Sequence, residues 1–434
     1  MRNEAGEQCR FEYDIAGRLV RERGFDGREL HFEYDKAGRC IAMMNGAGEQ
    51  TSYVRDAAGQ LVGKVLPDGD RVTYELDAFG RVTSAKNAAC EVRLDRDALG
   101  RPVRETLSLS EFGETYEVRR TFDGNGNVTA TATSLGYESR CEYDGDNRLS
   151  RFVANGVHSI EFHRDSSGRE TQRRLPGGGV LQQQYDAVGQ LISQTLDHAL
   201  PRFDFAGGVA PIPGTARLNR AFDYDAAGNV LSISDRLRGT VRYSYDERDR
   251  LVAAVRSDGL DEFFAYDLKG NVRSTRRRNE EAAVAEFGPG NRLTSRGETQ
   301  YFHDADGRLA AKEVRSGNGE IHKWQFSWRG DELAAVTTPD GGCWRYIYDP
   351  FGRRVAKIGP AGSSRFLWDG NVVVHHVEHA NGVSTWMFDP DSFSPIATSQ
   401  HGEFFPVVVD HLGTPREILD SKGKIGRASC RERV

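Results

Sequence analysis

The heptapeptide Tyr13-Asp14-Ile15-Ala16-Gly17-Arg18-Leu19 determines the fold, because related copies of it recur along the chain. In most copies an aspartate is followed three residues later by glycine, and successive aspartates are most often 21 residues apart. A fixed period of this length is typical of a repeat protein. The anchoring aspartates are Asp14, Asp35, Asp56, Asp77, Asp97, Asp123, Asp144, Asp165, Asp186, Asp225, Asp246, Asp267, Asp304 and Asp349.

Each residue type in the repeat favours a particular local structure. An aspartate side chain can accept hydrogen bonds from backbone N–H groups two residues on, and glycine can take the positive φ that closes a type I turn with a bulge. Aromatic residues alternate before the turn, as in Phe11-Glu12-Tyr13, which is typical of a strand. A second turn signal follows about ten residues later, for example Asn45-Gly46. The pattern predicts an all-β array of antiparallel hairpins with almost no helix.

A single hairpin is marginally stable in water, so the repeats are expected to pair edge to edge. The expected product is one long, spiralling antiparallel sheet with no independent domains along it. Many strands place charged residues opposite the aromatic face, as in Arg21-Glu22-Arg23. A sheet that is wet on one face fits the wall of a partial hollow shell.

Composition excludes several classes of protein. The chain has 434 residues and a net charge of −6 with both signs interspersed, so no nucleic-acid partner is expected. No apolar run is long enough to span a membrane, and the N-terminus lacks the apolar segment of a signal peptide. The 6 cysteines occur singly, which excludes a disulfide scaffold or a zinc ribbon.

The repeats and the C-terminal third resemble the YD-repeat proteins called Rhs (rearrangement hotspot) proteins. The most specific part of the resemblance begins with Tyr348-Asp349-Pro350-Phe351-Gly352-Arg353. It continues through Phe366-Leu367-Trp368-Asp369-Gly370 and the segment from Trp386 to Ala397. It ends with Asp410-His411-Leu412-Gly413-Thr414-Pro415-Arg416-Glu417. This order of segments is characteristic of the Rhs core.

The resemblance implies a non-catalytic β-shell that encapsulates a C-terminal toxin domain and helps to deliver it in competition between bacteria. It implies a bacterial cytoplasmic origin and secretion or surface display by a non-classical route such as type VI secretion. The implied partners are the chain's own toxin domain and an adaptor such as a spike protein, around a monomeric shell. The alternative is a cell-surface adhesive or carbohydrate-binding YD-repeat protein.

The family's shell ends in an aspartyl autoprotease with paired Asp-Pro motifs downstream of the Asp-His-Leu-Gly-Thr-Pro segment. Asp349-Pro350 and Asp389-Pro390 lie upstream of that segment, and we interpret both as turn openers. The sequence therefore predicts no catalytic residue, and the protease motif is expected beyond the end of this chain.

Other clusters have simpler structural readings. His375 and His376 are adjacent, so on a strand they point to opposite faces, and only His379 could share a face with His375. No metal site and no cofactor are predicted. Gly177-Gly178-Gly179 reads as a hairpin tip, and Arg276-Arg277-Arg278 as a solvated basic run. His411 beside Asp410 reads as part of a turn.

Five segments are expected along the chain. Residues 1–195 and 221–345 form two halves of the repeat array, separated by a Pro/Gly-rich loop at 196–220. Residues 346–423 form the Rhs core segment. Residues 424–434 depart from the pattern, and we interpret them as non-native sequence of sequencing-adapter origin, so that the chain is expected to be a fragment.

The candidate functional residues are therefore structural, and they fall into two sets. The repeat-motif set is Tyr13, Asp14, Gly17, Arg18, Tyr34, Asp35, Gly38, Arg39, Tyr185, Asp186, Gly189, Tyr224, Asp225, Gly228, Tyr266, Asp267 and Gly270. The core-end set is Tyr348, Asp349, Pro350, Gly352, Arg353, Asp410, His411, Leu412, Gly413, Thr414, Pro415 and Arg416.

Overall fold

The computed structural model describes residues 1–3, 6–198, 218–278, 280–378, 382–420 and 425–427. The described residues form a single 39-stranded sheet, in which the registered strand pairs are antiparallel and follow chain order. This confirms the predicted array of hairpins. The helical segments among the described residues are the single turns η1 (Pro176–Gly178) and η2 (Pro289–Asn291).

The chain divides into two compact units, and each is built from two separate stretches. Unit 1 comprises Met1–Tyr116 and Phe263–Arg365, and unit 2 comprises Glu117–Glu262 and Phe366–Val434. These boundaries differ from the linear divisions expected near residues 195 and 345, because stretches far apart in the sequence pack together within each unit.

Unit 1 contains the strands β1 (Arg10–Tyr13), β2 (Leu19–Arg23), β3 (Glu29–Tyr34), β4 (Cys40–Met44), β5 (Gln50–Arg55), β6 (Leu61–Val65), β7 (Arg71–Leu76), β8 (Val82–Lys86), β9 (Cys90–Arg96), β10 (Pro102–Leu109), β23 (Glu262–Tyr266), β24 (Val272–Arg277), β25 (Ala283–Phe287), β26 (Leu293–Arg296), β27 (Thr299–His303), β28 (Leu309–Arg315), β29 (Ile321–Arg329), β30 (Glu332–Thr337), β31 (Cys343–Tyr348) and β32 (Arg354–Gly359).

Unit 2 contains the strands β11 (Glu114–Phe122), β12 (Val128–Thr133), β13 (Glu138–Tyr143), β14 (Leu149–Ala154), β15 (His158–Arg164), β16 (Glu170–Arg174), β17 (Gly179–Tyr185), β18 (Leu191–His198), β19 (Leu218–Tyr224), β20 (Val230–Asp235), β21 (Gly239–Tyr245), β22 (Leu251–Arg256), β33 (Gly362–Asp369), β34 (Val372–Glu378), β35 (Gly382–Phe388), β36 (Pro395–Gln400), β37 (Glu403–Val409), β38 (Pro415–Leu419) and β39 (Ile425–Arg427). The first residue of β23 and the ends of β11 and β33 extend across the division between the units.

The first and last residues of the loop expected at 196–220 belong to strands. Strand β18 continues through His198, β19 begins at Leu218, and Leu196 is the register partner of Leu218. The rest of the expected loop, residues 199–217, lies outside the described residues.

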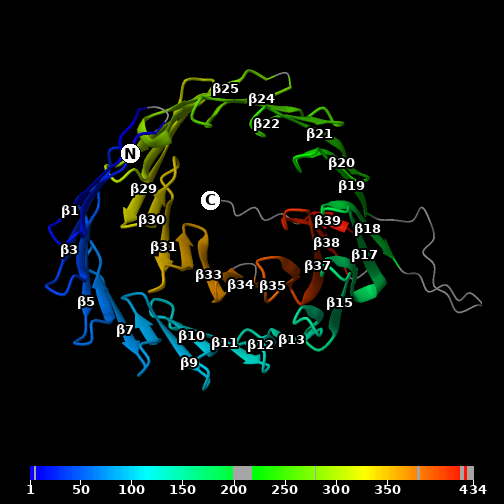
Figure 1. Cartoon of the computed structure of the whole chain (residues 1–434), viewed down its shortest axis with the longest axis horizontal. Helices are drawn as coiled ribbons and strands as arrows, with labels where there is room; N and C mark the ends of the chain where they lie inside the picture. Colours follow the sequence, from blue (N-terminus) through cyan, green and yellow to red (C-terminus); the bar gives the residue numbers. More distant parts are fainter. Residues whose placement is uncertain (4–5, 199–217, 279, 379–381, 421–424, 428–434) are drawn as a thin grey trace, which may run out of the picture. The chain divides into compact units, whose positions relative to one another are not determined.

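A hydrophobic cluster of buried residues lies in unit 2. Here the strands β35–β38 pack on β13–β19, and Figure 1 shows these two groups of strands side by side. Phe152, Leu181, Met387 and Val408 are among the fully buried members of one hydrophobic cluster. Burial of side chains of this size contributes about 1.5–3 kcal/mol each relative to exposure. Core-end strands therefore supply the second layer of this unit.

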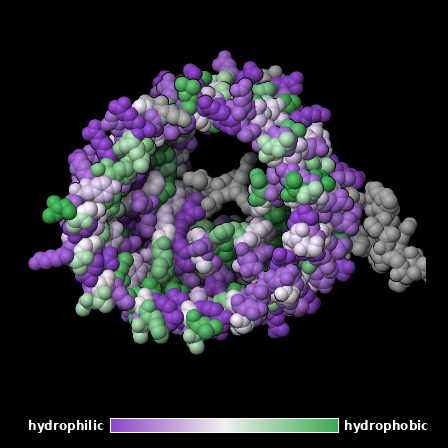
Figure 2. Space-filling model, viewed as in Figure 1, coloured by the Kyte–Doolittle hydropathy of each residue, from purple (hydrophilic) through white to green (hydrophobic). Residues whose placement is uncertain are grey.

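The first strands of unit 1 are more exposed to solvent. The four residues of β1 are all exposed, and most residues of β2 and β3 are only partly buried. Figure 2 shows hydrophilic residues over most of the viewed face, with single hydrophobic side chains between them. No helix of the described residues is long and apolar enough to cross a membrane.

Candidate functional site

The Asp-x-x-Gly turn is a compact hydrogen-bonded unit. The Oδ1 atom of Asp14 accepts the backbone N–H groups of Ala16 at 2.9 Å and Arg18 at 3.0 Å. The Oδ2 atom accepts the Nε–H of Arg18 at 2.6 Å. The backbone N–H of Arg18 is the largest cause that holds the pKa of Asp14 below its ordinary value. Gly17 closes the turn at a φ of +77°.

The same aspartate geometry recurs in the other repeats, although Asn147 and Asp249 take the positive-φ position in the turns of Asp144 and Asp246. In the next repeat, Asp35 bonds Arg39 and Gly38 has a φ of +81°. Strand registers shift at these turns, for example between Glu12 and Tyr13, as the expected bulge requires. Equivalent aspartate bonds are made by Asp77, Asp97, Asp123, Asp165, Asp186, Asp225, Asp246 and Asp267.

One turn supplies a matched test of the glycine requirement. Gly126 has a φ of +94°, Gly124 in the same turn does not have a positive φ, and an added Cβ would meet nothing within 4 Å at either position. Gly126→Ala is expected to lower the free energy of unfolding by about 1–2 kcal/mol. Gly124→Ala is expected to raise it or leave it unchanged, because only the unfolded chain loses freedom. Urea denaturation of both variants checks this, and equal effects would contradict the assignment.

The tyrosine of the motif connects each repeat to the one before it. The hydroxyl of Tyr34 donates to the backbone carbonyl of Leu19 at 2.8 Å, and that of Tyr185 donates to Glu170 at 2.9 Å. Equivalent bonds come from Tyr143, Tyr224, Tyr245 and Tyr348. Where arginine replaces tyrosine, its guanidinium reaches the equivalent carbonyl, as at Arg55, Arg96 and Arg164. The strand pattern alone did not predict this bond.

Tyr185→Phe removes one such link without changing the ring. We expect the free energy of unfolding to fall by about 1 kcal/mol, because the carbonyl of Glu170 loses a donor. Tyr13→Phe is the matched control, since Tyr13 is exposed and should change the stability by less than about 0.5 kcal/mol. The urea denaturation midpoints of the two variants are compared. A lower midpoint for Tyr185→Phe alone supports the hydrogen bond, and equal midpoints would mean that the ring of Tyr185 contributes only by packing.

A row of polar contacts joins the two stretches of unit 1, and we call it the unit 1 seam. Along it, residues 1–116 meet Asp-x-x-Gly turns and other turn and strand residues of residues 263–365. Arg308 binds Glu49 at 2.7 Å, and Lys269 binds Glu7 at 3.0 Å. Further seam contacts are Asp26–Arg292, Gly46–Asp306, Asp70–Arg329, Asn87–Tyr348 and Glu114–Arg365. In Figure 1, β29–β31 lie beside the first stretch of this unit.

The first core-end motif lies on this seam. Asp349 is 2% exposed and accepts the backbone N–H groups of Phe351 and Arg353. Arg353 binds Asp349 and also reaches Glu105 of the first stretch at 2.6 Å. Asp349-Pro350 therefore opens a turn like the others, in which the carboxylate is engaged by the backbone and one arginine.

The second core-end motif forms an equivalent turn in unit 2. Asp410 accepts the backbone N–H groups of Leu412 and Thr414, both at 3.0 Å, and Gly413 has a φ of +80°. The His411 ring packs on Phe222 with centroids 5.2 Å apart. Burial lowers the pKa of His411. This arrangement is a docked turn between β37 and β38.

A buried ionic group, which we call the Arg220 cluster, lies beside this turn. Arg220 is 1% exposed and donates to Gln194 at 2.8 Å, to Asp235 at 3.0 Å and to Glu417 at 2.7 Å. Glu417, on β38, is fully buried and is also bound by Arg238. Gln194, Arg220 and Asp235 are direct register partners on β18–β20. The cluster fastens the core-end strand to the repeat sheet.

The histidines of β34 have two different environments. His375 is fully buried between Thr133 at 2.8 Å and Thr385 at 2.9 Å. Desolvation lowers its pKa to about 4. His376 stacks on Phe366 with centroids 4.8 Å apart, and His379 lies outside the described residues. No group of three metal-ligating side chains occurs among the described residues.

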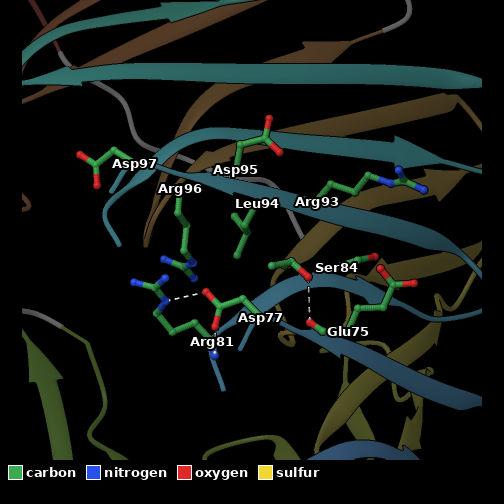
Figure 3. A pocket seen from close by; sticks show the side chains of 10 residues that line it. Glu75, Asp77, Arg81, Ser84, Arg93, Leu94, Asp95, Arg96 and Asp97 are labelled. Atoms are coloured by element: carbon green, nitrogen blue, oxygen red, sulfur yellow. Dashed lines mark hydrogen bonds and ion pairs between the residues drawn. The ribbon is translucent and has the colours of Figure 1, made fainter. Parts of the chain in front are cut away.

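An open hollow of about 450 Å³ lies over β7–β9 of unit 1 (Figure 3). Its lining mixes basic and acidic side chains, and these have partners in the wall. Arg81 binds Asp77, and Arg96 donates to backbone carbonyls of Val82 and Gly100. We assign no ligand to this hollow.

Comparisons with protein families identify the repeat. The family described as teneurin YD-shell matches residues 211–433, and the RHS repeat matches residues 34–69 and 55–89. Among the described residues, both matches include the turns and strands given above.

The chain is similar to parts of several named proteins. It is 29% identical over 365 residues to the double-stranded DNA deaminase toxin A of Burkholderia cenocepacia (strain H111), covering 74% of this chain and 24% of that protein. It is 31% identical over 317 residues to the probable deoxyribonuclease RhsB of Dickeya dadantii (strain 3937), covering 70% of this chain and 21% of that protein. The chain thus spans about a quarter of the length of these relatives.

A solved structure has the same fold. The structure of TcdB2-TccC3 without its hypervariable C-terminal region aligns with a TM-score of 0.67 and 12% identity, covering 96% of this chain and 24% of that one. The shared fold is an open, almost entirely antiparallel β-sheet of the kind found in that shell. Together with the family matches and the repeated Tyr-Asp turns, this shows that the chain belongs to the Rhs family of YD-repeat proteins.

Proposed function

We propose that this chain is part of the wall of a shell that encloses a C-terminal toxin domain. The proposal rests on the unit 1 seam. There, ion pairs between side chains join two stretches of the sheet that are far apart in the sequence. A sheet joined in this way can grow into a wall taller than one row of hairpins. The wetter faces of this unit are suited to a wall with solvent on both sides.

The wall is proposed to act without catalysis. Its charged groups are engaged in turns and seams, as Asp349 with Arg353 and Glu417 with Arg220 illustrate. A carboxylate that accepts backbone N–H groups and an arginine is stabilised in its ionised form and serves to fix a turn. Segments 1–195, 221–345 and 346–423 would all contribute to this wall.

We further propose delivery of the toxin in competition between bacteria by a non-classical route such as type VI secretion. The names of two relatives, a DNA deaminase toxin and a probable deoxyribonuclease, support a toxin as cargo. A spike protein is the kind of adaptor that this route would use. The activity of the cargo belongs to the cargo domain.

Limited proteolysis tests enclosure directly. The full chain carrying a C-terminal reporter domain of about 100–150 residues would be compared with the free reporter. We expect the enclosed reporter to be cleaved at least about tenfold more slowly, since only opened molecules expose it. The variant Arg308→Ala/Arg353→Ala, which breaks two seam contacts, should lose this protection.

Equal cleavage rates would contradict the proposal. If the fused and free reporters are cleaved at the same rate while the wall stays intact, the chain does not enclose its C-terminal neighbour. Binding of the same fusion to a glycan surface would then favour the adhesive function.

A further inference from the structure

The ion pairs of the unit 1 seam have one polarity. Residues 1–116 supply the carboxylate and residues 263–365 supply the base in each of the pairs Glu7–Lys269, Asp26–Arg292, Glu49–Arg308, Asp68–Arg329, Asp70–Arg329, Glu105–Arg353, Glu111–Arg345 and Glu114–Arg365. Asp306 brings a carboxylate of the second stretch to the seam, but it binds the backbone N–H of Gly46 and the amide of Asn45, which are neutral. Acids and bases therefore come from different stretches in these ion pairs.

The ion pairs between the two stretches of unit 2 have the opposite polarity. Arg120 binds Asp369, and both Arg220 and Arg238 bind Glu417. Here the bases belong to residues 117–262 and the carboxylates to residues 366–434. The side chains of Arg120 and Arg220 are 8% and 1% exposed, so these charges are removed from solvent where the stretches meet. In each unit, the later stretch thus meets charges of opposite sign in the earlier stretch of the same unit.

An exchange of the two later stretches would bring like charges together. If the basic seam residues of 263–365 docked on residues 117–262, they would meet the bases Arg120, Arg220 and Arg238. If residues 366–434 docked on residues 1–116, Asp369 and Glu417 would meet the seam carboxylates. Like charges that face each other across an interface strongly disfavour the contact, and the penalty is larger when solvent is excluded. The observed charges therefore oppose the exchanged arrangement.

The backbone of the turns does not distinguish one stretch from another. Asp14 of the first stretch and Asp304 of the second accept the same pair of backbone N–H groups, from the residues two and four places later. Gly17 and Gly307 close these turns at φ values of +77° and +82°. Polar strands with two wet faces also specify their pairing weakly. The choice of partner must therefore come from side chains, as charged side chains set the partner in a coiled coil.

We propose that the signs of these charges direct each later stretch of the sheet to the earlier stretch of its own unit. Attraction at the correct partner and repulsion at the wrong one together set the choice. The seam carboxylates and bases then determine which stretches meet, in addition to stabilising the contact. This inference concerns how the sheet assembles, and it does not depend on what the wall encloses.

Carbodiimide cross-linking of the full chain, analysed by mass spectrometry, tests the proposal. This reagent couples a lysine amine to a carboxylate that is in contact with it. The Nζ atom of Lys269 lies 3.0 Å from the Oε1 atom of Glu7, so an amide link between these two residues reports the native seam. The wild type should give this link, and its yield is the quantity compared among the variants.

Two other seam pairs, Asp26–Arg292 and Glu114–Arg365, can be changed while the reporting pair is kept. Asp26→Arg/Glu114→Arg sets a base against each partner arginine and should lower the yield of the link at least about tenfold. Adding Arg292→Glu/Arg365→Glu restores opposite signs with the polarity exchanged, and the yield should return to within about twofold of the wild type. Asp26→Asn/Glu114→Gln removes the attraction without adding repulsion and should give an intermediate yield.

The matched control is Glu33→Arg/Glu75→Arg, which makes the same charge change at exposed positions of β3 and β7. It should give the link as the wild type does. A wild-type yield from Asp26→Arg/Glu114→Arg would overturn the proposal. The proposal would also be overturned if the fourfold variant stayed as low as the twofold reversal, because the contact would then depend on the particular side chains and not on their signs.

Discussion

Arg220→Met is expected to lower the free energy of unfolding by about 3–5 kcal/mol, because it leaves two buried carboxylates and an amide with a lost donor. Asp235 is 7% exposed, Glu417 is fully buried, and Gln194 is 1% exposed. A methionine fills much of the volume of the arginine stem but offers no hydrogen bond. The unfolding transition that includes unit 2, followed in urea, measures the loss.

A surface arginine provides the matched control for this substitution. Arg169 binds Asp165, and the two side chains are 33% and 24% exposed. Arg169→Met should cost no more than about 1 kcal/mol, because solvent screens such pairs. A loss of less than about 1 kcal/mol for Arg220→Met would show that the Arg220 cluster does not fasten β38 to the repeat sheet.

His375 is expected to make unit 2 sensitive to mild acid. The folded pKa is about 4 against an ordinary value of 6.5, so the unfolded chain holds more protons between these values. Stability is therefore lost as the pH falls through this window. Between pH 7 and pH 5 the loss attributable to His375 should be about 2 kcal/mol.

Paired substitutions isolate this contribution. His375→Asn should remove about 2 kcal/mol of the difference in unfolding free energy between pH 7 and pH 5. His401→Asn, at an exposed turn position, should leave that difference unchanged. The turn aspartates, such as Asp14 and Asp35, have pKa values lowered from 3.8, so their contributions are lost below this window. Equal pH profiles for the two variants would contradict the assignment.

The sequence was sufficient to predict the local fold. Asp14 and Gly17 have a chemistry that specifies one kind of turn, and the period repeats that turn along the chain. The alternation of aromatic residues then fixes the strands and their pairing with the next hairpin. These are short-range relations, which a single sequence records directly.

The contacts between distant stretches could not be predicted. Glu49 and Arg308 are 259 residues apart, and nothing in either repeat distinguishes them from exposed residues of the same type. Which residues meet at the seam depends on the sum of many small twists between neighbouring strands. No single repeat contains that information. Arg220 and Glu417 were missed for the same reason, although an arginine directly after Leu218-Asn219 in a strand was a visible signal.

Cryo-electron microscopy of the full chain fused to a C-terminal reporter domain would show whether the wall encloses its C-terminal neighbour. If the chain forms a toxin-enclosing wall, density for the reporter should be surrounded by the sheet, and the seam contacts of Arg308 with Glu49 and of Arg353 with Glu105 should be formed. Reporter density outside the sheet, or a sheet whose stretches do not meet at the seam, would contradict a toxin-enclosing wall.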